Sequence, residues 1–213
     1  MAIKKIVKIW DQNKISEDNI KFLKERTKRV TFPTSSFIND VINDLIDTYK
    51  AITCAGIAAN QIGYDYQIFI GMKKIEDEAE GEEIEKKEAE LSSALENPYA
   101  DNYEIYINPQ IDKTDSKSTQ MDEEGCLSIP GLLVGRERYD KIKIRYYDIN
   151  GKKNKKTLSG FLSKLFQHEL DHLDGKLMID DMQKIENLYP VEASEENTKL
   201  YGNLFSNYRK LIK

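Results

Sequence analysis

The segment FQHELDHLDGK, residues 166–176, contains the pattern His-Glu-x-x-His and both histidines of the chain. Residues four apart in an α-helix lie on one face, so His168 and His172 can bind the same metal ion. Glu169 lies beside them and can reach a water molecule at that ion without being a ligand. The segment therefore predicts a helix that carries a catalytic metal site.

The third protein ligand cannot be a histidine, because no other histidine exists. Six residues after the second histidine the chain has Met178, whose thioether is a poor ligand for a Lewis-acidic ion. One alternative is a zinc endopeptidase that takes a glutamate from a downstream helix, with Glu192, Glu195 and Glu196 as candidates. The other alternative is the thiolate of Cys126 in EEGCLSIPG, which would complete three ligands with one open position.

Length and charge restrict the class of protein. With 213 residues the chain can form one domain with a sizeable core, and we expect a single domain over 1–213. A net charge of −5 argues against a large nucleic-acid interface, and no apolar stretch is long enough for a membrane span. The start, MAIKKIVKIW, is a poor signal peptide, and early acidic residues argue against a transit sequence. We therefore expect a cytoplasmic protein whose cysteines are not paired in a disulfide.

Periodicity gives a coarse map of the elements. Residues 35–53 have apolar side chains at helical spacing after Ser35 or Ser36, either of which can cap a helix. Residues 66–72 and 104–111 indicate strands, and we expect Pro109 to end the second. Residues 141–147 alternate in character, and Asn150-Gly151 suits a tight hairpin turn. Strands followed by one histidine-bearing helix indicate an α+β fold, with mixed or antiparallel strands around that central helix and a helix near each end of the chain.

Three further features concern the surroundings of these elements. Ser159 can cap the histidine-bearing helix, and Gly175 stands where such a helix would end. Residues 73–103 are rich in acidic side chains and indicate a solvated insertion. Residues 191–213 indicate a C-terminal helix with a stripe of apolar residues, which favours a docked helix over a free tail. That stripe comprises Leu200, Leu204, Tyr208 and Leu211.

Three short motifs together resemble the peptide deformylase family. They are CAGIAANQ at 54–61, EGCLS at 124–128 and QHELDHLDG at 167–175, in the order in which that family has them. The segments YINP, RYYDINGK and GKLMIDDM also look like the family, and the resemblance covers roughly residues 20–185. The first motif departs from the family at Cys54, where the family has glycine. A cysteine would be strained there if the position required a positive φ.

The resemblance implies a function and a set of site residues. The enzyme would remove the N-formyl group from the initiator formyl-methionine of nascent polypeptides and release formate. One divalent ion per chain, iron(II) in the cell with zinc, nickel or cobalt able to replace it, would be held by Cys126, His168 and His172. Glu169 would act as general base and then as acid, and Gln61 and the backbone N–H of Leu127 would stabilise the oxyanion. Glu124 would have no direct chemical role, with Arg138 as its salt-bridge partner.

The implied substrate is an N-formyl-methionyl peptide that adds as an extended strand. Main-chain contacts would come from Ala55, Gly56 and Gly125, and the methionine pocket would be lined by Phe161 and Leu165. A further expected partner is the ribosome near its exit tunnel, because four basic residues and no acidic residue follow Glu196. Reading of nucleic-acid sequence and membrane binding are not expected.

Overall fold

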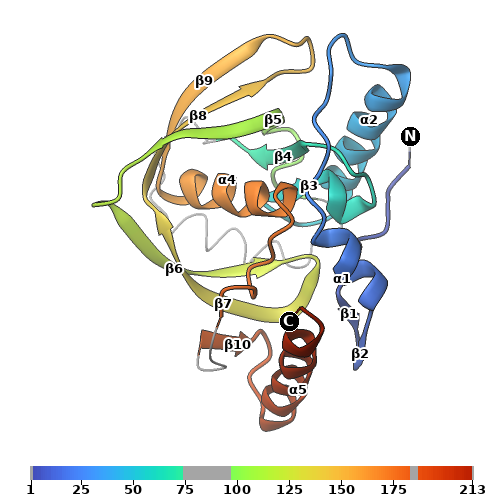
Figure 1. Ribbon diagram of the computed structural model, residues 1–213, viewed down its shortest axis with the longest axis vertical. Coiled ribbons are helices and arrows are strands. Elements are labelled where there is room, and N and C mark those ends of the chain that lie inside the picture. Colours follow the sequence, from blue (N-terminus) through green and yellow to red (C-terminus); the bar gives the residue numbers. More distant parts are fainter. Residues whose placement is uncertain (1, 74–96, 183–186, 213) are drawn as a thin grey trace.

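The computed structural model describes residues 2–73, 97–182 and 187–212 (Figure 1). A five-stranded antiparallel sheet has the order β3-β4-β5-β8-β9. Its strands are β3 (Gly56–Ala58), β4 (Ile68–Met72), β5 (Tyr103–Thr114), β8 (Lys141–Tyr147) and β9 (Lys153–Ser159). A three-stranded antiparallel sheet has the order β10-β7-β6, with β6 (Thr119–Cys126), β7 (Ile129–Tyr139) and β10 (Leu188–Pro190). The predicted combination of helices with antiparallel strands is confirmed.

The remaining elements surround these sheets. A short pair of strands, β1 and β2, precedes the first helix. The elements are β1 (Trp10–Asp11), β2 (Lys14–Ile15), α1 (Glu17–Leu23), α2 (Ser36–Ala51), the 3-10 helix η1 (Ala59–Ile62), α4 (Gly160–Leu173) and α5 (Glu195–Leu211). Within the described ranges, no helix has both the length and the apolar character needed to cross a lipid bilayer.

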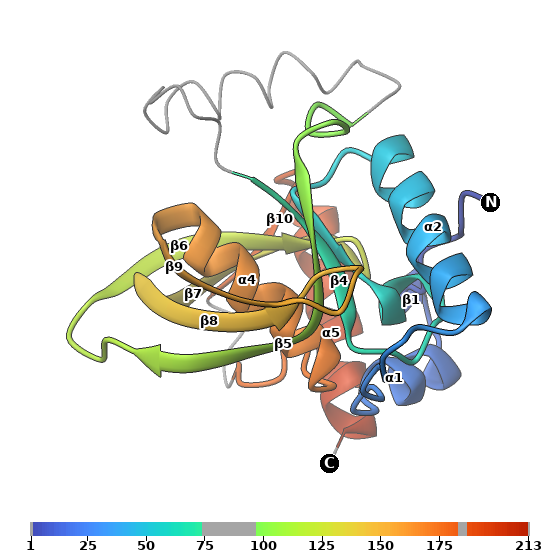
Figure 2. The same ribbon diagram turned by 90° about the horizontal axis from the view of Figure 1, so that it is seen from above.

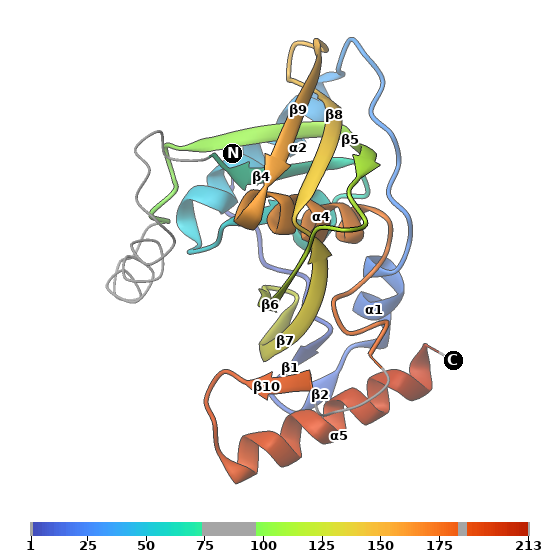
Figure 3. The same cartoon turned by 90° about the vertical axis from the view of Figure 1, so that its left-hand side faces the viewer.

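Helix α4 lies between the two sheets, as Figures 1 and 3 show. Helices α2 and α4 cover opposite faces of the five-stranded sheet (Figure 2). All five residues of β4 are buried, because Ile68 and Ile70 pack in the cluster with α2 whereas Phe69 packs against Phe166 of α4. Side chains alternate along a strand, so these residues point to opposite faces of the sheet, and β4 packs against both α2 and α4.

Helix α4 is fixed at its C-terminal end by the preceding part of the chain. The backbone N–H and side-chain hydroxyl of Thr27 both donate to the carbonyl of Leu173, at 3.0 and 2.9 Å. Gly175 has φ +72°, and a Cβ there would lie 2.4 Å from the carbonyl oxygen of Lys24. Glycine is thus required for the chain to leave the helix at this point. At the other end, Ser159 occupies the cap position, but its side chain makes no capping hydrogen bond.

Several predicted boundaries are corrected by the structure. Strand β5 continues through Pro109. Its pairing with β8 has a bulge between Ile107 and Gln110, so no hydrogen bond of the sheet requires an N–H on Pro109. The β8–β9 hairpin exists, but the chain between its strands is the five-residue loop 148–152 and not a two-residue turn. Most of the acidic insertion lies outside the described residues. Within its predicted range of 73–103, Asn97 and Tyr99 are buried.

The C-terminal helix α5 is docked on the body of the protein, as predicted. Leu204, Phe205 and Tyr208 are buried in a cluster with residues of β7 and of the segment that follows α4. The hydroxyl of Tyr208 donates to Asp180. Leu211 is an exception to the predicted stripe, because its side chain is exposed near the end of the helix.

Helix α2 begins where the sequence indicated. The hydroxyl of Ser35 accepts from the backbone N–H of Ile38, so Ser35 is the capping residue. On the same helix Asp44 is buried and accepts a hydrogen bond of 2.7 Å from the Tyr64 hydroxyl. That hydrogen bond lowers the pKa of Asp44, so its carboxylate stays ionised although it is buried.

Candidate active site

Three side chains from two distant segments meet at the inner face of α4. Cys126 at the end of β6 lies beside His168 and His172, and their potential ligand atoms are all within 4.8 Å of one another. The Sγ of Cys126 is 3.2 Å from Nε2 of His172, and the two imidazole rings have centroids 5.0 Å apart. Within the described ranges this is the one group of histidine, cysteine and acidic side chains found close enough to hold an ion.

Glu124 and Arg138 lie directly behind His168. Oε2 of Glu124 is 3.0 Å from Nδ1 of His168. Arg138 donates to both Glu124 oxygens, at 2.6 and 2.8 Å, and to Asp171 at 2.6 Å. A carboxylate on Nδ1 fixes the orientation of the imidazole and leaves Nε2 free for an ion. The predicted Arg138–Glu124 pair is therefore present, and Glu124 acts on the orientation of His168.

The charges around the three side chains suit a cation. Burial lowers the pKa of His168, but its contacts with Cys126 and Glu124 outweigh this and raise the pKa to about 10. The thiol of Cys126 and the carboxylate of Glu124 therefore favour a positive charge between them. Burial lowers the pKa of His172, which keeps its imidazole neutral and able to donate a lone pair. A Cys-His-His set fits zinc, iron or a related divalent transition ion.

Glu169 is buried next to this group, and no ion pair is found for it among the described residues. Its Oε2 is buried without a hydrogen-bond partner among the described atoms. Burial raises the pKa of Glu169 to about 7. Gly56 of β3 leaves room for this carboxylate, since a Cβ on Gly56 would lie 2.7 Å from Oε1 of Glu169. A carboxyl group with this pKa can accept and return a proton near neutral pH.

Gln61 points its amide toward the same group from η1. Its Oε1 accepts from the backbone N–H of Ala58 at 2.9 Å, which fixes the orientation of the amide. Its Nε2 lies 3.6 Å from the Sγ of Cys126 and 3.3 Å from the hydroxyl of Ser128. The amide N–H groups are therefore held at the edge of the cluster. Ser128 was not singled out from the sequence, although it ends the EGCLS motif.

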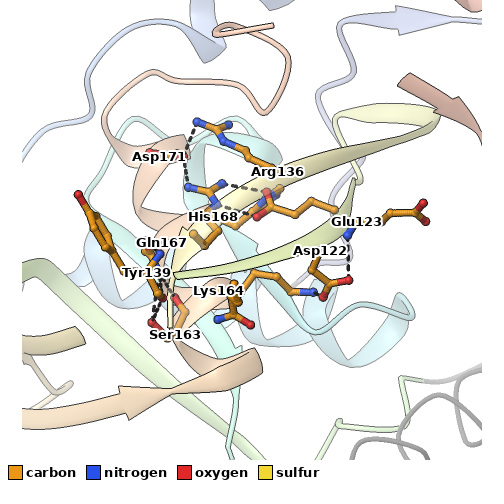
Figure 4. A network of polar contacts seen from close by, with 12 residues as sticks. Asp122, Glu123, Arg136, Tyr139, Ser163, Lys164, Gln167, His168 and Asp171 are labelled. Carbon is orange, nitrogen blue, oxygen red and sulfur yellow. Dashed lines mark hydrogen bonds and ion pairs between the residues drawn. The ribbon is translucent and has the colours of Figure 1, made fainter. Parts of the chain in front are cut away.

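These residues open into a pocket of about 830 Å³. Every predicted substrate-contacting residue lines it, and so does Leu127; the predicted set is Ala55, Gly56, Gly125, Phe161 and Leu165. Lys164 is at its margin, where it pairs with Asp122 (Figure 4). The Nζ of Lys164 also lies over the ring of Phe161. Sequence reasoning missed Ile6, Lys8 and Val191, which also line the pocket but lie outside the three motifs. Backbone hydrogen bonds of neighbouring residues bring these three to the site: Val7 donates to Gln61, Ile9 to Ser128 and Val191 to Gly131.

Cys54 occupies the position of the family glycine without backbone strain. Among the described residues, the positive-φ positions other than glycine are Gln12 and Asn108, so Cys54 has an ordinary φ. Its carbonyl accepts from the amide of Asn97 at 3.0 Å, and its thiol lines the pocket. Burial raises the pKa of this thiol, which keeps it neutral. The position therefore needs a small side chain rather than glycine.

The endopeptidase alternative finds no support in the described residues. Glu192, Glu195 and Glu196 are exposed, and none of them belongs to the group around His168 and His172. Glu192 precedes α5, and Glu195 and Glu196 lie in its first turn. The third residue of that group is instead Cys126.

Comparison with known proteins decides the family. The family model described as polypeptide deformylase matches residues 12–188, which is well over half of the chain. The chain belongs to the polypeptide deformylase family. It is 34% identical over 181 residues to the peptide deformylase of Elusimicrobium minutum, covering 84% of this chain and 88% of that protein. With the peptide deformylase of Chloroflexus aggregans it is 31% identical over 199 residues, covering 92% and 96%.

Solved peptide deformylases have the same fold. The Thermotoga maritima structure has 27% identity and a TM-score of 0.63, covering 86% of this chain and all of that one. The Plasmodium falciparum structure, a complex with an inhibitor, has 27% identity and a TM-score of 0.62, covering 98% and 99%. The chain is thus a metal-dependent hydrolase that removes the N-formyl group from nascent peptides.

Proposed function

We propose that Cys126, His168 and His172 hold one divalent ion, which is iron(II) in the cell and can be replaced by zinc, nickel or cobalt. The observation that carries this proposal is the convergence of the three ligand atoms within 4.8 Å, with Glu124 orienting His168 from behind. A bound ion supplies Lewis acidity at this point, which acidifies water and polarises a carbonyl oxygen. His168 and His172 lie on one face of α4, and Cys126 meets them from the end of β6.

Glu169 moves the proton in this proposal. Its carboxylate accepts a proton from the water molecule that adds to the formyl carbon. When the bond between the formyl carbon and the methionine nitrogen breaks, Glu169 returns that proton to the departing nitrogen. The products are formate and a peptide with a free N-terminal amine. The buried carboxyl, with its pKa of about 7, suits both directions of transfer at neutral pH.

Gln61 and Leu127 stabilise the negative charge that develops on the formyl oxygen. The amide of Gln61 is held in place by Ala58 and points to the group around Cys126. The backbone N–H of Leu127, next to Cys126, is the second donor. Loss of one such donor usually lowers the rate by about 10²–10³-fold. We expect Gln61→Ala to lower kcat by about this factor.

The peptide lies extended between two strands that are each at the edge of a described sheet. These strands are β3, which begins at Gly56 directly after Ala55, and β6, which contributes Gly125. An edge strand has free N–H and C=O groups, so an extended peptide can pair with it. Phe161 and Leu165 of α4 line the pocket for the methionine side chain.

The wider proposals concern the whole chain. We assign residues 1–213 to one catalytic domain that acts in the cytoplasm, the location indicated by the N-terminal sequence. We also propose that α5 binds the ribosome near the exit tunnel through its basic end, where Arg209 and Lys210 lie in the last turn. Deleting 192–213 and measuring ribosome co-sedimentation tests this, and unchanged binding would exclude it.

The first experiment measures formate release from a formyl-methionyl peptide. The protein is purified without oxygen and loaded with iron(II) or nickel, and Glu169→Gln is assayed beside it. We expect release by the wild type and a loss of at least 10²-fold in the variant, with one ion still bound. Cys126→Ala should lose the ion, whereas Glu192→Gln should keep it. The opposite pattern of metal loss would refute the assigned ligands.

A further inference from the structure

The five-stranded sheet has a concentration of positive charge at the end formed by β5, β8 and β9. Residues 141–159, which form the β8–β9 hairpin, contain seven basic residues and one acidic residue. The hairpin therefore has a net charge of +6 in a chain whose total is −5, so the rest of the chain carries −11. A local excess of one sign of charge is typical of a surface that binds a partner of the opposite sign.

Strand register gathers most of these charges on one face of the sheet. Directly opposite residues of antiparallel strands point to the same side, and so do residues two apart along a strand. Lys143 is opposite Lys113 of β5, and Arg145 is opposite Lys155 of β9. Two more lysines lie two residues away from these along β8 and β9. We call the six residues the basic face: Lys113, Lys141, Lys143, Arg145, Lys153 and Lys155.

The other face of β8 is buried against α4. Ile142, Ile144 and Tyr146 alternate with the basic residues and pack in one cluster with Phe166 of α4. Helix α2, on the side of the sheet away from α4, packs on β3 and β4. The lysines of the basic face are therefore exposed. Figures 1 and 3 show the β8–β9 hairpin at the end of the molecule opposite α5.

The like charges on this face are unfavourable within the protein itself. Lysine directly opposite lysine, and arginine directly opposite lysine, repel each other and destabilise a sheet. Arg145 pairs with Asp112 at 3.0 Å, and it is the one member of the basic face for which an ion pair is found among the described residues. A surface that served solubility alone would mix charges of both signs. The uncompensated charge therefore favours an anionic partner.

The layout of the basic face fits a row of phosphates better than a small anion or unpaired bases. Side chains two apart along a strand are about 7 Å apart and neighbouring strands are about 4.8 Å apart, so the charges form an extended grid and not a pocket. Tyr147 is the aromatic residue beside this grid, and its ring already packs against Phe32, with centroids 5.3 Å apart. Duplex RNA is recognised through phosphates and shape rather than by stacking of aromatic side chains.

We propose that the basic face binds the phosphate backbone of duplex RNA without reading its sequence. The negative total charge of the chain does not oppose this, because exposed charges further apart than about 8–10 Å are screened at physiological salt. The basic face is separate from the basic end of α5, and none of its members lines the active-site pocket. An enzyme bound to RNA through this face therefore keeps its pocket open to substrate.

Fluorescence anisotropy with a dye-labelled RNA duplex of about 20 base pairs measures the binding, using the full metal-loaded protein. We expect a Kd of about 10⁻⁶–10⁻⁴ M, the range of sequence-independent binding, and the same value for two duplexes of unrelated sequence. If four members of the basic face contact phosphates, the slope of log K against log salt concentration is about −3.6. The affinity should then fall about 10²-fold between about 50 and 200 mM salt.

Lys113→Glu separates RNA binding from folding. A glutamate opposite Lys143 replaces a like-charge pair by an opposite-charge pair, so the urea midpoint should rise while the RNA affinity falls about tenfold. Lys143→Gln should make the salt slope less steep by about one. Lys210→Gln is the matched control, because Lys210 is an exposed lysine in the last turn of α5 and should leave affinity and slope unchanged. All three variants should release formate from a short formyl-methionyl peptide at the wild-type rate.

Vesicles of phosphatidylserine and phosphatidylcholine are the second probe, because Ile149 in the loop between β8 and β9 is 52% exposed beside the basic residues. Binding to these vesicles without binding to the duplex would overturn the inference and assign the face to a membrane surface. Absence of duplex binding by the wild type would overturn it as well. So would an affinity that Lys113→Glu leaves unchanged, or a loss in Lys210→Gln equal to that in Lys143→Gln. Formate release plays no part in this decision, so the proposed function stands or falls separately.

Discussion

Replacing Glu124 by glutamine tests whether the support behind His168 controls both stability and metal binding. Glu124 is 4% exposed and accepts two hydrogen bonds from Arg138, which is 7% exposed. Burial raises the pKa of Glu124, but the contacts with Arg138 and His168 outweigh it and hold the pKa well below its usual range. The carboxylate is thus ionised in the folded protein, and glutamine removes the charge with almost no change in volume.

The size of the effect follows from this burial. Removing one partner of a buried ion pair typically destabilises a protein by about 3–5 kcal/mol, because the remaining charge stays unpaired. Arg138 keeps its contact of 2.6 Å with Asp171, so we expect the lower end, about 3 kcal/mol. His168 also loses the carboxylate on Nδ1, which should lower metal affinity by about 10–100-fold.

Urea unfolding measures the first effect, and competition with a chelator measures the second. Glu123→Gln is the matched control, because it removes the same charge from the neighbouring, exposed position and should change stability by less than about 0.5 kcal/mol. Adding Arg138→Met to Glu124→Gln should recover part of the lost stability, since no buried charge of the pair remains. A stability and a metal affinity unchanged in Glu124→Gln would refute the role given to this pair.

Three further outcomes follow from single contacts. Gly56→Ala should fold but lose about 10²-fold in kcat, because the added Cβ would lie 2.7 Å from Oε1 of Glu169 and would displace this carboxylate. Formate release measures the loss of activity, and a thermal melt shows whether the variant is folded. Tyr208→Phe should lower the free energy of unfolding by about 1 kcal/mol through loss of its hydrogen bond to Asp180, measured in urea. Because the tyrosine hydroxyl on Asp44 lowers the pKa of that carboxyl, its stabilisation is complete above its ordinary pKa of 3.8 and is lost as the pH falls through the lower folded-state pKa. Asp44→Asn should therefore make the free energy of unfolding depend less on pH in the acidic range. An unchanged pH dependence would contradict this.

Sequence reasoning succeeded where the chemistry depends on local spacing. The helical period alone places His168 and His172 on one face. The caps of α2, the end of α4 at Gly175 and the docked apolar face of α5 are likewise local signals, and the structure has all three. The error at Pro109 has a non-local cause. Pro109 was expected to end a strand because its bulge cannot be seen without the partner strand β8.

Residue type and the helical period establish which side chains can bind an ion and which can move a proton. Residue spacing left the third ligand open between Cys126 and a downstream glutamate, and the family resemblance favoured Cys126. Tertiary structure alone brought Cys126 to within 3.2 Å of His172, 46 positions later, and placed Arg138 behind Glu124. It also carried Val191 to the pocket. Contacts of this kind depend on how sheets and helices pack over long stretches of chain, and no local period of the sequence encodes that packing.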